Sequence, residues 1–331
     1  MNKKLSIIIS NRNDTVMLCI TIRSCIEELR FLPADQKEII VVDNSDEHIY
    51  KQLTGILPVG YLRDRLLKVY RQPSPCLFSA RELAAQKATG DYIICLDSHM
   101  LVGRGTFEDL VRFKIERSFD QTIGFLHAPI SWAHQHERSA KHDRDMSVNE
   151  LGDWGSAYKT PRTITWKGMP WLCDRKWFLN ELNGYGALSK HQISWGGGDM
   201  HIGIKPWLLG YKNWAVPTSP CIHIGPFPKE VNKLNPHLTK PSSNSTHQYR
   251  LYGQSGNYPS VFGFLVSCYI LGGESMMHRN APAIKERFGR FIDIEKWWDK
   301  AIELGQEEKD WLDARKVITF EQLLELKPWD I

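Results

Sequence analysis

The chain has 331 residues, of which 42% are apolar and 24% charged, and its formal net charge is +4. These values are typical of a globular protein with one large domain or two small ones, and the mild positive charge permits a phosphate-bearing partner without requiring one. The seven cysteines include no C-x-x-C pair and several lie in apolar runs. This pattern favours buried free thiols in a reducing compartment over a disulfide framework or zinc site.

Three short runs rich in Ile and Val predict buried strands in the first hundred residues, at 6–10, 38–43 and 92–97. Between them, helices are predicted from about Asp14 to Arg30 and from a cap at Ser79 to a stop at Gly90. Strands that alternate with helices predict an α/β fold with a mostly parallel sheet.

Polar residues follow each of these three strands, at 11–13, 43–44 and 97–99. Ligands of such sheets bind at the carboxyl ends of the strands. We therefore expect a ligand site where these three segments meet.

The second half of the chain is less regular. A polar segment over 127–165 is predicted as an insertion, and helices are predicted over 174–183 and 199–209. Residues 229–260 lack periodicity, which indicates a lid or binding loop.

The C-terminal part, from about residue 261, is predicted to be helical, with a capping box that begins at Thr319. Its apolar run over 261–273 is shorter than the roughly 20 residues of a membrane-spanning helix, so we expect a buried helix. With no targeting segment visible at the start, a cytoplasmic protein without a membrane span is expected.

Asp97 and His99 are the first candidate site residues. At positions i and i+2 of a strand end, a carboxylate and an imidazole can point to the same side and bind a borderline ion such as Mn²⁺. The same pattern also occurs in a strand-end turn with an Asx-type hydrogen bond.

Two further motifs have a structural and a functional interpretation. The glycines at 196–198 allow a close approach to a ligand, and Asp199 then opens a helix, either as a general base or only as a helix cap. His223 lies in an apolar strand, where a histidine is either a ligand or a satisfied core residue.

In this order, the segments resemble the GT-A glycosyltransferases of the family 2 type, and most of all the catalytic domain of polypeptide N-acetylgalactosaminyltransferases. The resemblance covers roughly residues 5–228 and is carried by "LSIIISNRND", "EIIVVDNSD", "SARELAAQKATGDYIICLDSHM", "GMPWLCDRKWFLNELNGY", "SWGGGDMHIGIKPWLLGY" and "PCIHIGPF". It implies a Rossmann-like nucleotide-binding half over 1–100, a donor-sugar and acceptor half over 101–228, a loop or lid over 229–260 and a helical extension over 261–331.

The resemblance also implies a donor, a metal and a set of roles. A UDP-sugar would be the donor and Mn²⁺ or Mg²⁺ the metal, which clamps the diphosphate. The implied metal ligands are Asp97, His99 and His223, and the implied nucleotide contacts are Asn11, Arg12, Asp43, Arg81 and Asp97. The residues implied beside the donor sugar and acceptor are Trp166, Gly196, Gly197 and Gly198, and those implied for catalysis are Trp195, Asp199 and His201.

The chain departs from the family pattern at three positions. Gly198 replaces the usual acid, which follows as Asp199; His201 replaces a Glu; and Pro226 stands where the late histidine ligand is usual. The third metal ligand, the sugar and the stereochemistry therefore remain open. Asp199 is the natural base of an inverting enzyme, and a sugar or acceptor ligand in a retaining one.

The acceptor has to be inferred from the remaining residues. Arg138, Lys141 and Arg144 lie in a stretch that mixes basic and aromatic residues, which suits DNA or an extruded base, or is a solvated loop. Virus-encoded relatives glycosylate hydroxymethylated pyrimidines in DNA, which makes such DNA the expected acceptor. The alternatives are a bacterial surface-glycan or peptide Ser/Thr glycosyltransferase and a non-catalytic nucleotide-sugar or DNA-binding module; no obligate protein partner is evident.

Overall fold

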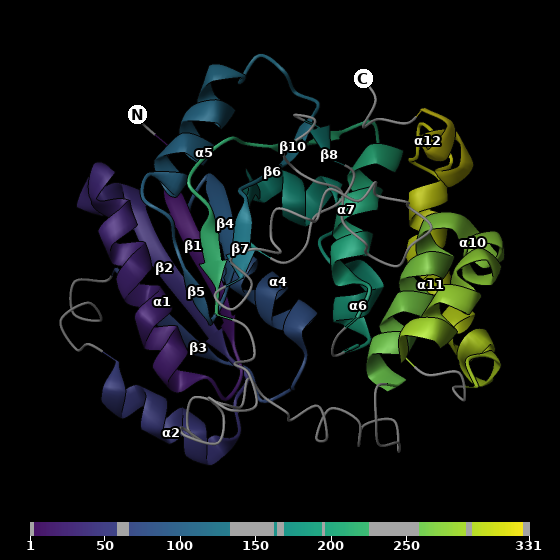
Figure 1. The fold of residues 1–331 in the computed structure, drawn as a ribbon, viewed down its shortest axis with the longest axis horizontal. Helices are drawn as coiled ribbons and strands as arrows, with labels where there is room; N and C mark the ends of the chain where they lie inside the picture. Colours follow the sequence, from purple (N-terminus) through teal and green to yellow (C-terminus); the bar gives the residue numbers. More distant parts are fainter. Residues whose placement is uncertain are drawn as a thin grey trace.

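An eight-stranded sheet forms the centre of the protein, and three further strands make a small second sheet beside it (Figure 1). The structure is a computed structural model and describes residues 3–57, 66–132, 162–163, 169–193, 196–224, 258–288 and 293–326. The strand order of the large sheet is β3-β2-β1-β4-β9-β6-β10-β8.

The three predicted strands lie side by side and parallel, as β1 (Leu5–Asn11), β2 (Lys37–Asp43) and β4 (Tyr92–Asp97). In this register Asn11 pairs with Asp43 and Ser10 with Asp97, so the polar ends of all three strands meet at one edge. Burial on both faces explains their nearly continuous apolar sequence.

The other strands of the large sheet are β3 (Leu67–Arg71), β6 (Ile123–His127), β8 (Arg162–Thr163), β9 (Trp171–Asp174) and β10 (Lys212–Ala215). β9 runs antiparallel between β4 and β6, and β8 runs antiparallel to β10. The predicted mostly parallel α/β sheet is thus confirmed, with these two antiparallel strands as exceptions.

The small sheet has the order β5-β11-β7, with β5 (Met100–Leu101), β7 (Ile130–Trp132) and β11 (Cys221–His223). His223 pairs with Met100, and the backbone N–H of Ile224 donates to the carbonyl of His99 over 2.9 Å. This pairing brings a late segment of the chain to the end of β4.

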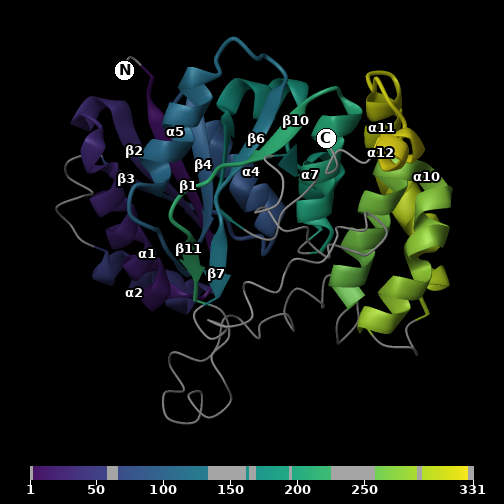
Figure 2. The ribbon, with the colours of Figure 1, turned by 45° about the horizontal axis from the view of Figure 1, so that its top comes forward.

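Helices and short helical turns connect the strands. Their bounds are α1 (Thr15–Glu28), η1 (Leu29–Phe31), η2 (Ala34–Gln36), α2 (Glu47–Ile56), α4 (Leu77–Lys87), α5 (Thr106–Glu116), η4 (Trp177–Glu181), α6 (Gly186–Lys190) and α7 (Gly198–Leu208). α6 and α7 lie between the sheet and the C-terminal helices (Figures 1 and 2).

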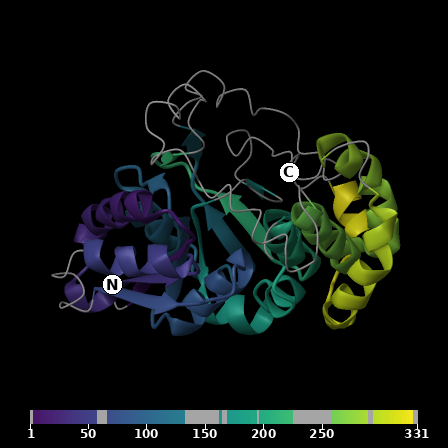
Figure 3. The same ribbon diagram turned by 90° about the horizontal axis from the view of Figure 1, so that it is seen from below.

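The C-terminal helices gather at one end of the molecule, away from α1 and α2 (Figure 3). They are α10 (Tyr258–Phe288), η6 (Glu295–Trp297), α11 (Trp298–Asp313) and α12 (Phe320–Leu326), and α10 is kinked at Gly273. In the described part of the chain, the segment Val261–Pro282 alone is long and apolar enough to cross a membrane, and 72% of its most apolar window is buried within the fold. That burial agrees with the predicted core helix.

Local details confirm some predictions and correct others. Thr319 forms the predicted capping box with Gln322, and the seven cysteines are free, six of them buried.

The predicted starts of two helices differ from the observed ones. Cys76 and not Ser79 caps α4, because the Cys76 Sγ accepts the Ser79 N–H over 3.4 Å. Asp174 ends a strand, so the helix predicted from 174 starts only at Arg175. Most of the predicted insertion and loop lies outside the described residues.

Candidate metal centre

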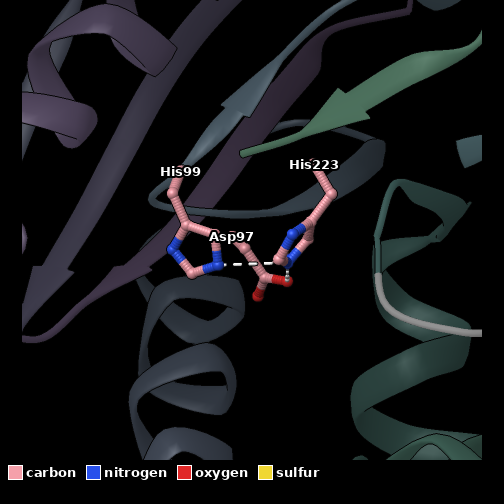
Figure 4. Close-up of side chains that lie close together, drawn as sticks. All are labelled: Asp97, His99 and His223. Atoms are coloured by element: carbon pink, nitrogen blue, oxygen red, sulfur yellow. Dashed lines mark hydrogen bonds and ion pairs between the residues drawn. The ribbon is translucent and has the colours of Figure 1, made fainter. Parts of the chain in front are cut away.

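Three potential metal ligands converge at the edge of the sheet where β4 ends. The Nε2 atoms of His99 and His223 lie 3.1 Å apart, and His223 Nε2 is 3.7 Å from Asp97 Oδ2. One ligand atom from each residue lies within 4.8 Å of the others. Figure 4 shows both rings pointing toward one another and toward the carboxylate.

Each ligand atom of this group is placed by a different element. Asp97 is the last residue of β4, His99 lies in the turn that follows, and His223 ends β11. His223 faces ionisable groups and not the apolar core that the alternative interpretation of its strand predicts. One carboxylate and two imidazoles are a donor set that suits a borderline divalent ion, so these residues fit the metal expected from the sequence.

Charges around Asp97 compensate for its burial. Burial alone would raise the pKa of Asp97, but Arg81, His99 and His223 lower it, so the carboxylate form is favoured. Arg81 is 4% exposed, donates from Nη2 to Asp97 Oδ1 over 2.6 Å and from Nη1 to the Tyr185 hydroxyl over 3.2 Å. Arg81 thus binds Oδ1 of Asp97, and Oδ2 remains directed toward the two histidines.

Opposing effects also act on His99. Burial would lower its pKa, whereas a hydrogen bond to Asp14 and the charge of Asp97 raise it, with a net upward shift. The Asp14 Oδ2 atom lies 3.2 Å from His99 Nδ1, on the far side of the ring from His223.

The expected base-reading residue, Asp43, is fully buried, and neighbours occupy its carboxylate. Oδ2 accepts from Asn11 Nδ2 over 2.5 Å and from Ser45 Oγ over 2.8 Å, and Oδ1 accepts from the Ser45 N–H over 3.1 Å and from Arg71 Nη1 over 3.3 Å. A direct contact between Asp43 and a base remains a prediction that requires one of these bonds to be exchanged. Asn11 Oδ1 has no hydrogen-bond partner among the described residues.

Arg12 and Asn13 connect the ends of β1 and β2. Arg12 Nη1 donates to the Asn44 carbonyl over 2.6 Å, and the Asn13 N–H donates to Ser45 Oγ over 2.7 Å. The pKa of Arg12 is lowered, mainly by burial. The charge of Arg71 lowers it further, and the charge of Asp46 partly offsets the shift. The structure therefore places the predicted residues Asn11, Arg12 and Asp43 in one polar cluster beside the metal ligands.

The three glycines before Asp199 are each required for a physical reason. Gly196 and Gly197 have φ angles of 97° and 73°, which other residues rarely adopt. A Cβ at Gly198 would lie 2.1 Å from Phe78 Cε1. Asp199 then lies in the first turn of α7.

His201 has buried charged neighbours, and its catalytic role stays a prediction. Its side chain is fully buried, and Nε2 lies 3.0 Å from Glu308 Oε1 of α11 and 3.1 Å from Lys205 Nζ. Asp199 and His201 are two positions apart on a helix, which turns their side chains to nearly opposite directions. The predicted residues Arg138, Lys141, Arg144, Trp166 and Trp195 lie outside the described residues.

Four residues that contact the site are not among those predicted from the sequence: Asp14, Ser45, Arg71 and Tyr185. The available signal for Asp14 and Ser45 was their position next to a predicted strand end, in the segments "SNRND" and "DNS". Arg71 and Tyr185 come from remote parts of the chain, and only the pairing of β2 with β3 and the packing of α6 on α4 bring them close.

The sequence is similar to known glycosyltransferases. Residues 6–149 match the model of glycosyl transferase family 2. Polypeptide N-acetylgalactosaminyltransferase 3 of Drosophila melanogaster is 25% identical over 57% of this chain and 30% of its own length. The mouse enzyme named polypeptide N-acetylgalactosaminyltransferase 4 is 23% identical over 76% of this chain and 42% of its own length. The chain thus spans less than half the length of these relatives.

Solved structures show the same fold. The structure of GalNAc-T7 with UDP, GalNAc and Mn²⁺ superposes with a TM-score of 0.63, at 21% identity, over 98% of this chain and 57% of that one. The mannosyltransferase PcManGT of Pyrobaculum calidifontis, with GDP-Man and Mn²⁺, gives 0.52 at 15% identity, over 95% of this chain and 84% of that one. The predicted GT-A fold, similar to the catalytic domains of polypeptide N-acetylgalactosaminyltransferases, is confirmed.

Proposed function

We propose that this chain, which has the GT-A fold and a match to glycosyltransferase family 2, is an active metal-dependent glycosyltransferase. It would move a sugar from a UDP-sugar to a hydroxyl group. The observation that carries this proposal is the convergence of Asp97, His99 and His223 at the carboxyl end of β4, beside the polar ends of β1 and β2.

Asp97, His99 and His223 would hold Mn²⁺. The ion would neutralise negative charge on the diphosphate as UDP leaves. Arg81 fixes the orientation of Asp97 and buries a positive charge next to the same place, which favours an anionic ligand there. Asn11 and Arg12 would line the nucleotide pocket. There the side-chain oxygen Oδ1 of Asn11, which has no hydrogen-bond partner among the described residues, could accept an N–H of the base.

In the transfer, an acceptor oxygen forms a bond to the anomeric carbon while the bond from that carbon to the diphosphate breaks. The glycines 196–198 would let the sugar approach the backbone at the start of α7. Asp199 would take the proton of the acceptor hydroxyl if the enzyme inverts, and bind sugar or acceptor if it retains. The anomeric configuration of the product distinguishes the two roles.

The first acceptor we propose is DNA with hydroxymethylated pyrimidines. The support is the mixed basic and aromatic stretch that holds Arg138, Lys141 and Arg144. Neutralising these three residues together should weaken DNA binding and flatten its dependence on salt, because each lost phosphate contact lowers the slope by about 0.9. An unchanged affinity and slope in the triple variant would exclude this stretch as the DNA contact.

A peptide hydroxyl is the second candidate acceptor. It is favoured by the names of the relatives, which are polypeptide N-acetylgalactosaminyltransferases. Another relative is named an inactive polypeptide N-acetylgalactosaminyltransferase-like protein, from Macaca fascicularis and 27% identical, so similarity alone does not exclude a binding module.

A transfer assay tests the proposal and separates these candidates. The protein is incubated with Mn²⁺, a panel of UDP-sugars that starts with UDP-N-acetylgalactosamine, and either hydroxymethylcytosine DNA or Ser/Thr peptides, and products are weighed by mass spectrometry. A nucleoside or peptide heavier by one sugar identifies donor and acceptor. If UDP is released but no product becomes heavier, the protein is a glycosyltransferase with a different acceptor. If no donor yields UDP, the result supports a non-catalytic binding module.

A further inference from the structure

Asp14 stands at the start of a helix but does not cap it. α1 begins at Thr15, and Asp14 occupies its N-cap position without any side-chain capping bond. Asp is among the preferred N-cap residues, because its carboxylate can accept an N–H of the first turn. Here the carboxylate is directed elsewhere, with Oδ2 3.2 Å from His99 Nδ1.

Several contacts hold the backbone before Asp14 in place. Asn13 has a φ of 57°, a left-handed conformation that redirects the chain between β1 and α1. Its side chain donates to Asp46 Oδ2 over 3.1 Å and accepts the Asp46 N–H over 2.9 Å. The position of Asp14 therefore depends on the segment that also contributes Asn11 and Arg12 to the polar cluster.

This contact decides which nitrogen of His99 carries the proton. A carboxylate only accepts hydrogen bonds, so Nδ1 must be the donor toward Asp14. In the neutral ring, Nε2 then carries the lone pair, and Nε2 is the atom that faces His223 and Asp97. The Ser98 hydroxyl also lies near Nδ1, at 3.4 Å, but it is more distant and uncharged.

We infer that Asp14 is a positioning residue for the metal centre. It sets the tautomer and ring orientation of His99, so that Nε2 is ready to bind the ion. This inference rests on the proposed function and extends it: the segment that carries the proposed nucleotide contacts Asn11 and Arg12 also positions a ligand of the metal site. Partners of this kind change metal affinity by about 10- to 100-fold.

Mn²⁺ binding to the full chain, measured by isothermal titration without any nucleotide, tests the inference. We expect Asp14→Ala to weaken binding by about 10- to 100-fold, and Asp14→Asn to weaken it less because its amide oxygen still accepts from Nδ1. The matched control is Glu28→Gln, which removes a carboxylate at the other end of α1, where it accepts the Gly105 N–H. Because Asp14 makes no capping bond, the helix content of Asp14→Ala should match the wild type.

A second measurement needs no metal. Long-range ¹H–¹⁵N spectra at about pH 8.5, where imidazoles are neutral, report the tautomer of each histidine. His99→Gln identifies the His99 signals by their loss. The wild type should show His99 protonated at Nδ1, and Asp14→Ala should lose this preference while the other histidines keep theirs.

The outcomes separate the inference from the function on which it rests. Equal Mn²⁺ affinity in wild type and Asp14→Ala would overturn the inference and leave the metal site intact. A His99 ring protonated at Nε2 in the wild type would also overturn it. A wild-type protein that binds no Mn²⁺ would overturn the metal site itself, and the role of Asp14 with it.

Discussion

At the scale of single residues, the site consists of ligands that other side chains hold in place. Asp97 accepts from Arg81, which is itself bound to Tyr185, and His99 is bound to Asp14. A ligand held in this way loses less rotamer freedom when it binds an ion. Replacing the supporting residue should therefore affect metal binding without removing a ligand.

Replacing Arg81 by Met tests this arrangement. Met fills a similar volume but leaves the partly buried Asp97 without its cation, so the pKa of Asp97 should rise and the Mn²⁺ affinity should fall. The loss of one partner of a buried ion pair costs about 3–5 kcal/mol of unfolding free energy. Titration calorimetry and urea unfolding measure both effects.

Arg112→Met is the control for that variant. Arg112 lies on α5, its side chain is 58% exposed, and it pairs with Asp109 on the same helix. Its replacement should change neither Mn²⁺ affinity nor stability measurably. Equal behaviour of the two variants would show that Arg81 does not support Asp97.

The sequence predicts the position of Asp97 and His99 because both follow a recognisable buried strand. It leaves His223 open, because only the pairing of β11 with β5 brings this residue to His99. It also does not indicate that His201 contacts Glu308 of α11, since the neighbours of a residue on α7 depend on what packs there. Local pattern thus identifies strand ends, whereas contacts between distant segments require the structure.

At the scale of elements, the start of α7 depends on glycines that touch other elements. A Cβ at Gly197 would lie 2.6 Å from the carbonyl oxygen of Gly263 in α10, and Ser267 Oγ lies 3.3 Å from the Gly197 carbonyl. Gly197, one of the residues predicted to face the donor sugar, is therefore packed directly against α10. The sequence indicates the glycine turn but gives no sign of its partner.

Gly197→Ala should destabilise the protein and lower its activity. The φ of 73° costs about 1–2 kcal/mol for a non-glycine residue, and the clash with a backbone atom adds to that cost. The control is Gly55→Ala in α2, where nothing lies within 4 Å of the added Cβ and helix propensity predicts a gain of up to about 1 kcal/mol. Thermal unfolding compares the two; a Gly197→Ala protein as stable as wild type would contradict the described turn.

At the scale of the whole molecule, a buried ionic cluster joins the C-terminal helices to the sheet domain. Glu308 of α11 accepts from Lys205 Nζ over 2.7 Å and from the Ala187 N–H over 2.6 Å, and lies 3.0 Å from His201 Nε2. Lys205 and His201 are fully buried. The C-terminal helices thus belong to the same folded unit as α7. Composition and periodicity alone do not indicate this contact.

Glu308→Gln should strongly destabilise the protein, by about 3–5 kcal/mol, because Lys205 would remain buried without its carboxylate. The control is Glu307→Gln, one position earlier on α11, where the exposed carboxylate pairs with Lys190. That change should leave urea unfolding at neutral pH unaltered. If both variants unfold at the same urea concentration, the cluster does not join the two parts of the molecule.

The same carboxylate predicts how stability depends on pH. Burial would raise the pKa of Glu308, but Lys205 and His201 lower it to about 2, below the ordinary value of 4.5 for a glutamate. A lowered pKa adds stability above pH 4.5 that is lost as the pH falls toward 2. Glu38, also lowered to about 2, titrates in the same window, so the difference between wild type and Glu308→Gln isolates the contribution of Glu308. Parallel curves for the two proteins between these pH values would contradict the assignment.

The most direct test of the central claim is the affinity of the protein for UDP, measured by titration calorimetry with Mn²⁺ and then with excess EDTA. If Asp97, His99 and His223 form a metal centre for a nucleotide sugar, UDP should bind only with Mn²⁺, and Asp97→Asn should bind it weakly under both conditions. UDP binding of equal strength with Mn²⁺, with EDTA and in Asp97→Asn would contradict the account.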